Sequence, residues 1–131
     1  ETKSKNIIVI SWIIRLILSI IFTLAAYLKF SGSHDMILMF NIIGVGQWFR
    51  LVTGAIELLG AIFLMIPKLT GFGSVLIMGV MAGAIAAHLY IIGGSFTFPL
   101  ALLLTSMLEL FISRKKIQKA FDRTFYAIKE K

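Results

Sequence analysis

Residues 73–92 read GSVLIMGVMAGAIAAHLYII and contain no Asp, Glu, Lys or Arg. A helix of about 20 residues is roughly 30 Å long, which matches the hydrocarbon core of a bilayer. Three further apolar runs occur at about 7–28, 46–66 and 96–113. The chain has 131 residues, 59% of them hydrophobic, and a soluble domain of this size could not bury that much apolar surface. The sequence therefore predicts an all-α membrane protein, a bundle of four transmembrane helices within residues 1–113.

The connections between the apolar runs contain turn-forming residues. Pro67 and Gly71 flank a short loop, and Gly93-Gly94-Ser95 precedes the fourth run. The longest connection, from Gly32 to Gly46, is rich in apolar residues and predicts a short helix in the outer membrane interface. The first run lacks an A-x-A cleavage site, so we expect a retained helix rather than a signal peptide.

The formal net charge is +7, and most of the excess lies in residues 114–131. Under the positive-inside rule, this cluster predicts that both termini lie in the cytoplasm. The expected location is a bacterial-type inner (plasma) membrane. We interpret the tail as an amphipathic basic helix in contact with anionic lipid, and a helix that docks a protein partner is the alternative. Nucleic acid is not an expected partner. The apolar stripe of the tail consists of Ile117, Phe121, Phe125 and Ile128.

The chain has no cysteine, which excludes a disulfide scaffold, a thiol redox centre and a cysteine-ligated cluster within it. The two histidines are His34, in the predicted connection, and His88, so neither a bis-histidine haem site nor a zinc site is expected. The sequence contains no nucleophile–base pair and no phosphate-binding loop. These observations leave no catalytic motif and no predicted metal site.

Arg15 is the single charge within residues 7–28, Glu57 is the single charge within residues 51–66, and His88 lies in the third apolar run. A charge at mid-membrane depth costs at least about 2.5–3.5 kcal/mol, so it normally faces a partner, water or a ligand. Arg15 and Glu57 lie at similar depths, roughly 12–14 Å from the inner ends of their runs, and we predict a buried ion pair. The pair could simply join two helices, or it could form a polar pocket that binds a head group or relays protons. Glu109 is interpreted as an interfacial carboxylate near basic residues.

His88 lies about 22 Å from the inner end of its run, which places it in the outer leaflet. Lys29, Arg50, Tyr27 and Tyr90 are expected at a similar level. We predict that these five residues bind a ligand in a cationic, aromatic-edged cleft, and a quinone carbonyl, a phosphate or a carboxylate would suit it. The alternative is an interfacial belt of snorkelling cations and aromatic residues.

Small residues recur every four positions at Gly79, Gly83 and Ala87, and the second run also contains small residues at Gly54, Ala55, Gly60 and Ala61. Such patterns allow helices to approach closely. We expect them to serve packing within the chain, with a homo-oligomer as the alternative.

Several short segments together resemble the DoxX-like family, including the MauE/DoxX redox-associated membrane proteins. The resemblance covers about residues 12–112, and all its motifs are short. They are the run Arg15–Phe22 followed by Lys29-Phe30, the segment Glu57-Leu-Leu-Gly60, the Pro67–Gly71 turn, and His88-Leu89 at the end of a helix.

The resemblance implies a small four-helix membrane protein with polar positions at Arg15, Lys29, Glu57 and His88. Family members are associated with thiosulfate:quinone oxidoreduction, with resistance to quinones and oxidants, and with methylamine-utilisation maturation; a distant branch assists receptor assembly. For this chain it implies binding of a quinone or similar amphiphile and support of a redox partner, as an accessory subunit rather than an enzyme. A non-catalytic assembly factor is the alternative, and a small transporter is a weaker one.

Overall fold

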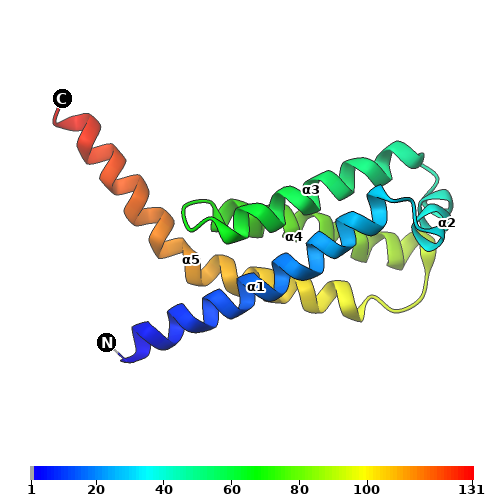
Figure 1. Cartoon of the computed structure of the whole chain (residues 1–131), viewed down its shortest axis with the longest axis horizontal. Helices are drawn as coiled ribbons and strands as arrows, with labels where there is room; N and C mark the ends of the chain where they lie inside the picture. The colour runs from blue at the N-terminus through cyan, green and yellow to red at the C-terminus, as the bar shows by residue number, and fades with distance from the viewer. Residues whose placement is uncertain (1) are drawn as a thin grey trace.

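The computed structural model describes the backbone of residues 2–131 and the side chains of residues 5–114 and 125–131. Four long helices run side by side in alternating directions, and a short helix lies at one end of them (Figure 1). We call this end the α2 end; the N-terminus and the α3–α4 turn lie at the opposite, terminal end. The elements in chain order are α1 (Thr2–Phe30), α2 (His34–Ile43), α3 (Gln47–Met65), α4 (Thr70–Ala87), a π-helical turn η1 (His88–Ile92) and α5 (Thr97–Lys129).

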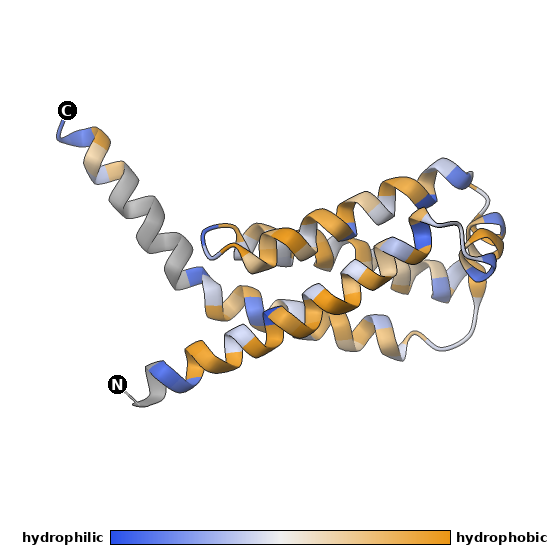
Figure 2. Cartoon of the chain, viewed as in Figure 1, coloured by the Kyte–Doolittle hydropathy of each residue, from blue (hydrophilic) through white to orange (hydrophobic). Residues whose placement is uncertain are grey.

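Four segments are long and apolar enough to cross a membrane, which confirms the predicted all-α membrane fold. Most residues along these helices are hydrophobic (Figure 2). Many large apolar side chains on them are exposed, as expected where lipid is the solvent. The predicted bounds agree with the observed ones to within about three residues. The observed spans are Lys5–Phe30, Gln47–Met65, Thr70–Ile92 and Thr97–Arg114.

The short helix expected between Gly32 and Gly46 is α2. Gly32 and Gly44 flank it with φ of +68° and +82°, a left-handed conformation that glycine adopts without a steric penalty. The Gln47 side-chain amide donates to the Ile37 carbonyl at 3.1 Å and to Asn41 Oδ1 at 2.7 Å. These bonds tie α2 to the start of α3.

Contact between neighbouring spans depends on glycines of α3 and α4. A Cβ atom at Gly60 would lie 2.8 Å from Ile77 Cγ1, and one at Gly73 would lie 2.8 Å from the Gly60 carbonyl oxygen. A Cβ at Gly54 would lie 3.2 Å from Lys29 Cβ. The predicted close approach at Gly54 and Gly60 is therefore confirmed. The core that these approaches enclose consists of Leu18, Phe22, Ala61, Leu64, Ile77, Met81 and Leu102.

Gly79 and Gly83 do not serve packing within the described chain, so this expectation is wrong. A Cβ atom built at either position meets nothing within 4 Å, and both residues are exposed. Of the most apolar part of each span, 11% of residues are buried in Thr70–Ile92, against 28% in each of the other three. One face of α4 is therefore left uncovered by its own bundle.

The basic tail is not a separate helix, because α5 continues as one helix from Thr97 to Lys129. Its C-terminal part leaves the bundle at the terminal end (Figure 1). Of the predicted apolar stripe, Phe125 and Ile128 are exposed, and the side chains of Ile117 and Phe121 lie outside the described residues. The division of the chain into residues 1–113 and 114–131 remains a prediction.

The glycine contacts predict a sharp difference between two alanine substitutions in α4. Gly73→Ala places its methyl group within 3.0 Å of the Gly60 carbonyl oxygen and the Leu64 nitrogen, so the backbone must move. We expect a loss of roughly 1–3 kcal/mol of unfolding free energy, measured by tryptophan fluorescence during denaturation in detergent. Gly79→Ala is the matched control and should be neutral; equal losses in both variants would contradict the packing described.

Candidate functional site

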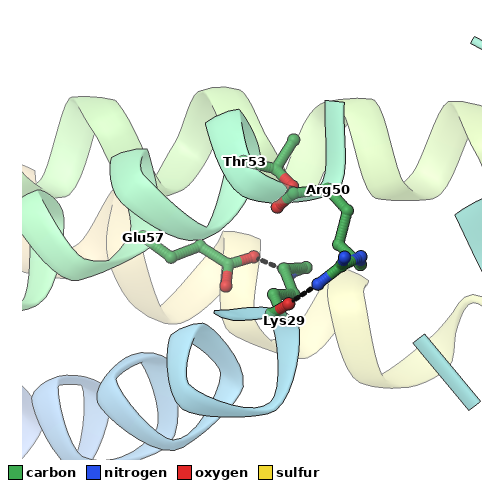
Figure 3. Close-up of polar contacts among 4 residues, drawn as sticks. All are labelled: Lys29, Arg50, Thr53 and Glu57. Carbon is green, nitrogen blue, oxygen red and sulfur yellow. Dashed lines mark hydrogen bonds and ion pairs between the residues drawn. The ribbon is translucent and has the colours of Figure 1, made fainter. Parts of the chain in front are cut away.

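A buried ion pair between Lys29 of α1 and Glu57 of α3 lies in the half of the bundle nearer the α2 end (Figure 3). The Glu57 side chain is 1% exposed and that of Lys29 is 13% exposed. Lys29 Nζ donates to Glu57 Oε1, and Glu57 Oε2 has no hydrogen-bond partner among the described residues. The contact of Gly54 with the Lys29 stem, three residues before Glu57, sets the helix register that brings the two charges together.

The predicted ion pair between Arg15 and Glu57 is wrong. Arg15 Nε instead donates to the Leu64 carbonyl at 2.6 Å, and Leu64 lies seven residues beyond Glu57, about 10 Å further along α3. The depth estimate failed because it measured both residues from the ends of their apolar runs. With 29 residues against 19 for α3, α1 extends further than that estimate assumed.

Arg50 of α3 holds the end of α1. One of its guanidinium nitrogens, Nη1, donates to the Lys29 carbonyl (Figure 3). Its Nε donates to Gln47 Oε1 at 2.8 Å. The carbonyls in the last turn of a helix lack partners within it, and a cation there is also favoured by the helix dipole. Arg50 therefore positions the backbone that carries Lys29.

A second polar cluster, which sequence reasoning missed, occupies the terminal end of the bundle. Glu109 of α5 is fully buried and accepts hydrogen bonds from Ser11 Oγ at 2.6 Å and from Ser113 Oγ at 3.0 Å. Glu109 also interacts electrostatically with Arg15, whose guanidinium lies 3.8 Å from the centroid of the Trp12 ring. The only signal in the sequence was the spacing of four residues between Glu109 and Ser113.

The uncovered face of α4 forms one wall of a groove of about 660 Å³, which we call the α2–α4 groove. It lies between α2, α3, α4 and η1, and most of its lining is apolar. Gly79 and Gly83 lie on its α4 wall, and Met36, Met39 and Phe40 line it from α2. Its volume lies within the range of about 300–1,000 Å³ that is typical of small-molecule sites. The polar side chains along it are Lys29, Thr53, Glu57, His88 and Tyr90.

His88 lies where α4 passes into the π-helical turn η1. Its Nδ1 lies 2.8 Å from the Ala84 carbonyl oxygen, and a carbonyl only accepts, so Nδ1 is the donor. The Gly93 N–H bonds to the His88 carbonyl at 2.9 Å, five residues back, which closes the wider turn. Turns of this type often occur at functional sites in helices.

The two tyrosines predicted for the cleft are separated. Tyr90 lines the α2–α4 groove and is 85% exposed. Tyr27 is 65% exposed and does not line it. The structure thus brings Lys29, His88 and Tyr90 to one groove and leaves Tyr27 and Arg50 outside its lining.

Comparison with protein families gave a match to the DoxX-like family over residues 13–109. The chain belongs to the DoxX-like family. The matched region includes Lys29, Arg50 and Glu57, the Arg15 and Glu109 members of the second cluster, and nearly the whole four-helix bundle. A search of curated proteins and a search of solved structures each found no match.

The buried ion pair predicts strongly non-additive effects on stability in this DoxX-like protein. Glu57→Leu leaves the Lys29 ammonium buried without its partner, and Lys29→Met does the converse to the carboxylate; each should cost about 3–5 kcal/mol. The double variant removes both charges and should cost less than the sum of the single variants by about 1–3 kcal/mol. Unfolding in mixed detergent micelles measures all three, and purely additive losses would contradict a functional ion pair between these groups.

Proposed function

We propose that this DoxX-like membrane protein binds a quinone or a similar amphiphile in the α2–α4 groove and supports a redox partner as an accessory subunit. The observation that carries the proposal is that one groove combines a long apolar wall with a small set of polar side chains. These are Lys29, Thr53, Glu57, His88 and Tyr90, and we call them the polar end of the groove. The wall residues on α4 and η1 run from Val75 to Ile92, a rise of about 26 Å. An amphiphile needs both features, because its tail must lie in an apolar environment and its head must be hydrogen-bonded.

The polar end of the groove supplies the contacts that a head group requires. Lys29 uses one of its three N–H donors on Glu57, which leaves two for a ligand. His88 Nε2 and the Tyr90 hydroxyl are additional polar groups on the same lining. The tail would lie against Gly79 and Gly83, where the absence of side chains deepens the wall.

The first experiment is mass spectrometry of the full chain purified in mild detergent, first intact and then after lipid extraction. A quinone or one defined lipid at near-stoichiometric amount supports the groove as a binding site. A protein that carries only mixed bulk phospholipid argues against it. His88→Ala should reduce recovery of the ligand, and Tyr27→Phe, outside the groove, should not.

Filling the groove provides a test that does not alter its polar groups. Gly83→Phe places a ring where nothing lies within 4 Å of the Cβ position, so the fold should tolerate it while the tail loses its place. We expect bound ligand to fall about tenfold, the effect of losing roughly 1.4 kcal/mol of binding free energy. Ile20→Phe, at a position 60% exposed on α1 and outside the groove, is the matched control. Unchanged occupancy in Gly83→Phe would remove the groove from the proposal.

We propose a second role, as a non-catalytic assembly factor, because α5 extends well beyond its membrane span. The span ends at Arg114 and the helix continues to Lys129, with Phe125, Tyr126 and Ile128 exposed. Such a helix suits contact with anionic lipid or with a protein partner. If it docks a partner, deletion of residues 115–131 abolishes partner recovery while the ligand in the groove is retained. Recovery that survives the deletion would argue against this role.

The topology proposal, with both termini in the cytoplasm, makes a separate prediction. A fluorescent protein fused after Lys131 should fold and fluoresce in bacterial cells, because its chromophore does not mature when it is exported unfolded. Alkaline phosphatase inserted at Gly94, in the loop at the α2 end, should be active, because it requires the oxidising exterior. The opposite pattern of the two reporters would invert the orientation.

A further inference from the structure

At the polar end of the α2–α4 groove, several acceptor atoms are not used by hydrogen bonds within the protein. Glu57 Oε1 accepts from Lys29, but Glu57 Oε2 is buried with no hydrogen-bond partner among the described residues. A carboxylate oxygen left in this state is costly, because it has lost its hydration without gaining a hydrogen bond. This oxygen belongs to the Glu57 side chain, which lines the groove and is only 1% exposed. This carboxylate therefore keeps an unused acceptor atom in a residue that lines the groove.

His88 presents a second acceptor. Its Nδ1–H is committed to the Ala84 carbonyl at 2.8 Å. In the neutral ring the other nitrogen, Nε2, then carries a lone pair and accepts a hydrogen bond. The ring orientation is held by the helix itself, four residues back, so this tautomer is imposed by the backbone rather than by a ligand.

Thr53 adds a third acceptor to the same lining. Its hydroxyl donates to the Arg50 carbonyl at 3.0 Å, which uses its proton and leaves the oxygen lone pairs (Figure 3). Lys29 Nζ is the one cation among the lining residues of the groove and supplies donors. The polar end thus combines donors from one ammonium group with acceptor atoms on Glu57, His88 and Thr53, and the Tyr90 hydroxyl can either donate or accept.

We propose that the α2–α4 groove selects an amphiphile whose head carries hydroxyl groups, and that it binds a dihydroxy-aromatic (quinol) head more tightly than the corresponding dicarbonyl (quinone). This inference rests on the proposed function, because it specifies the head group of the ligand proposed for the same groove. A hydroxyl oxygen accepts from Lys29 while its proton satisfies Glu57 or His88. A carbonyl oxygen accepts from Lys29 but leaves the acceptor atoms of Glu57 and His88 without a donor.

The energetic reason for selection is the cost of unsatisfied groups, not the strength of one bond. A site built to receive a hydroxyl discriminates strongly against an analogue without it, because its own buried polar atoms are then left unpaired. Both forms of the ligand share the same tail, so contacts with Gly79 and Gly83 are equal for the two. The difference in affinity between them therefore isolates the head-group contacts.

The test uses the full wild-type chain in phosphatidylcholine nanodiscs under anaerobic conditions. A short-tailed benzoquinol and the benzoquinone with the same tail are titrated separately, and the two dissociation constants are compared by tryptophan quenching and by competition. We expect the quinol to bind about tenfold more tightly. Equal affinities, or tighter binding of the quinone, would overturn the inference while leaving the groove as a binding site.

Substitutions of His88 and Thr53 test whether these acceptors cause the preference for the quinol. His88→Phe should reduce the quinol preference to about threefold or less, and Thr53→Val provides a second, nearly isosteric probe. Tyr27→Phe is the control outside the groove and should leave the preference unchanged. If neither ligand binds, or if Gly83→Phe leaves the binding of both unaltered, the proposed function itself fails and the inference fails with it. If both bind in the groove and His88→Phe and Thr53→Val leave a tenfold preference intact, these two acceptors are not its source.

Discussion

Two arginines in the α1–α3 pair each satisfy the terminal carbonyls of the other helix. Arg15 of α1 donates to the Leu64 carbonyl near the end of α3, and Arg50 of α3 donates to the Lys29 carbonyl near the end of α1. Within a bilayer such carbonyls have no water to bond, so their partners must come from the protein. Because the helices are antiparallel, the two caps act at opposite ends and fix the register of the pair. The rest of the bundle is assembled against this pair.

The register places Glu57 beside Lys29 and keeps the two charges out of lipid. A separate contact, between Gly60 of α3 and Gly73 of α4, holds α4 against α3 along the first half of α4. Beyond that contact α4 has no neighbour over Gly79 and Gly83, and α2 only partly covers the opening. The groove therefore forms where the close packing of α4 against α3 ends, before Gly79. The same ion pair that neutralises the bundle interior then supplies the polar end of the groove.

The sequence predicted the membrane spans well, because a helix that crosses the lipid is the stable structure for a long run of apolar residues. It predicted the pair Arg15–Glu57 wrongly, because equal depth in two runs does not give equal height in a bundle whose helices differ in length. Glu109 was assigned to the interface on its distance from the end of the fourth run. Its burial depends on Ser11, nearly a hundred residues away in the chain, and no local pattern carries that contact. The small residues Gly79 and Gly83 had the spacing of a packing motif but line a groove, since the spacing alone does not state which partner is present.

By itself the sequence determined the class of the protein, the number and limits of its spans, the short helix α2, and the presence of ionisable groups that lipid could not solvate. Local composition decides these features, because hydrophobic length and turn residues act over a few residues. Only the tertiary structure decided which charges meet, which glycines pack, and where the groove lies. Those outcomes depend on the relative shift of α1 and α3 along their axes, and this shift is set by side-chain contacts between segments far apart in the chain.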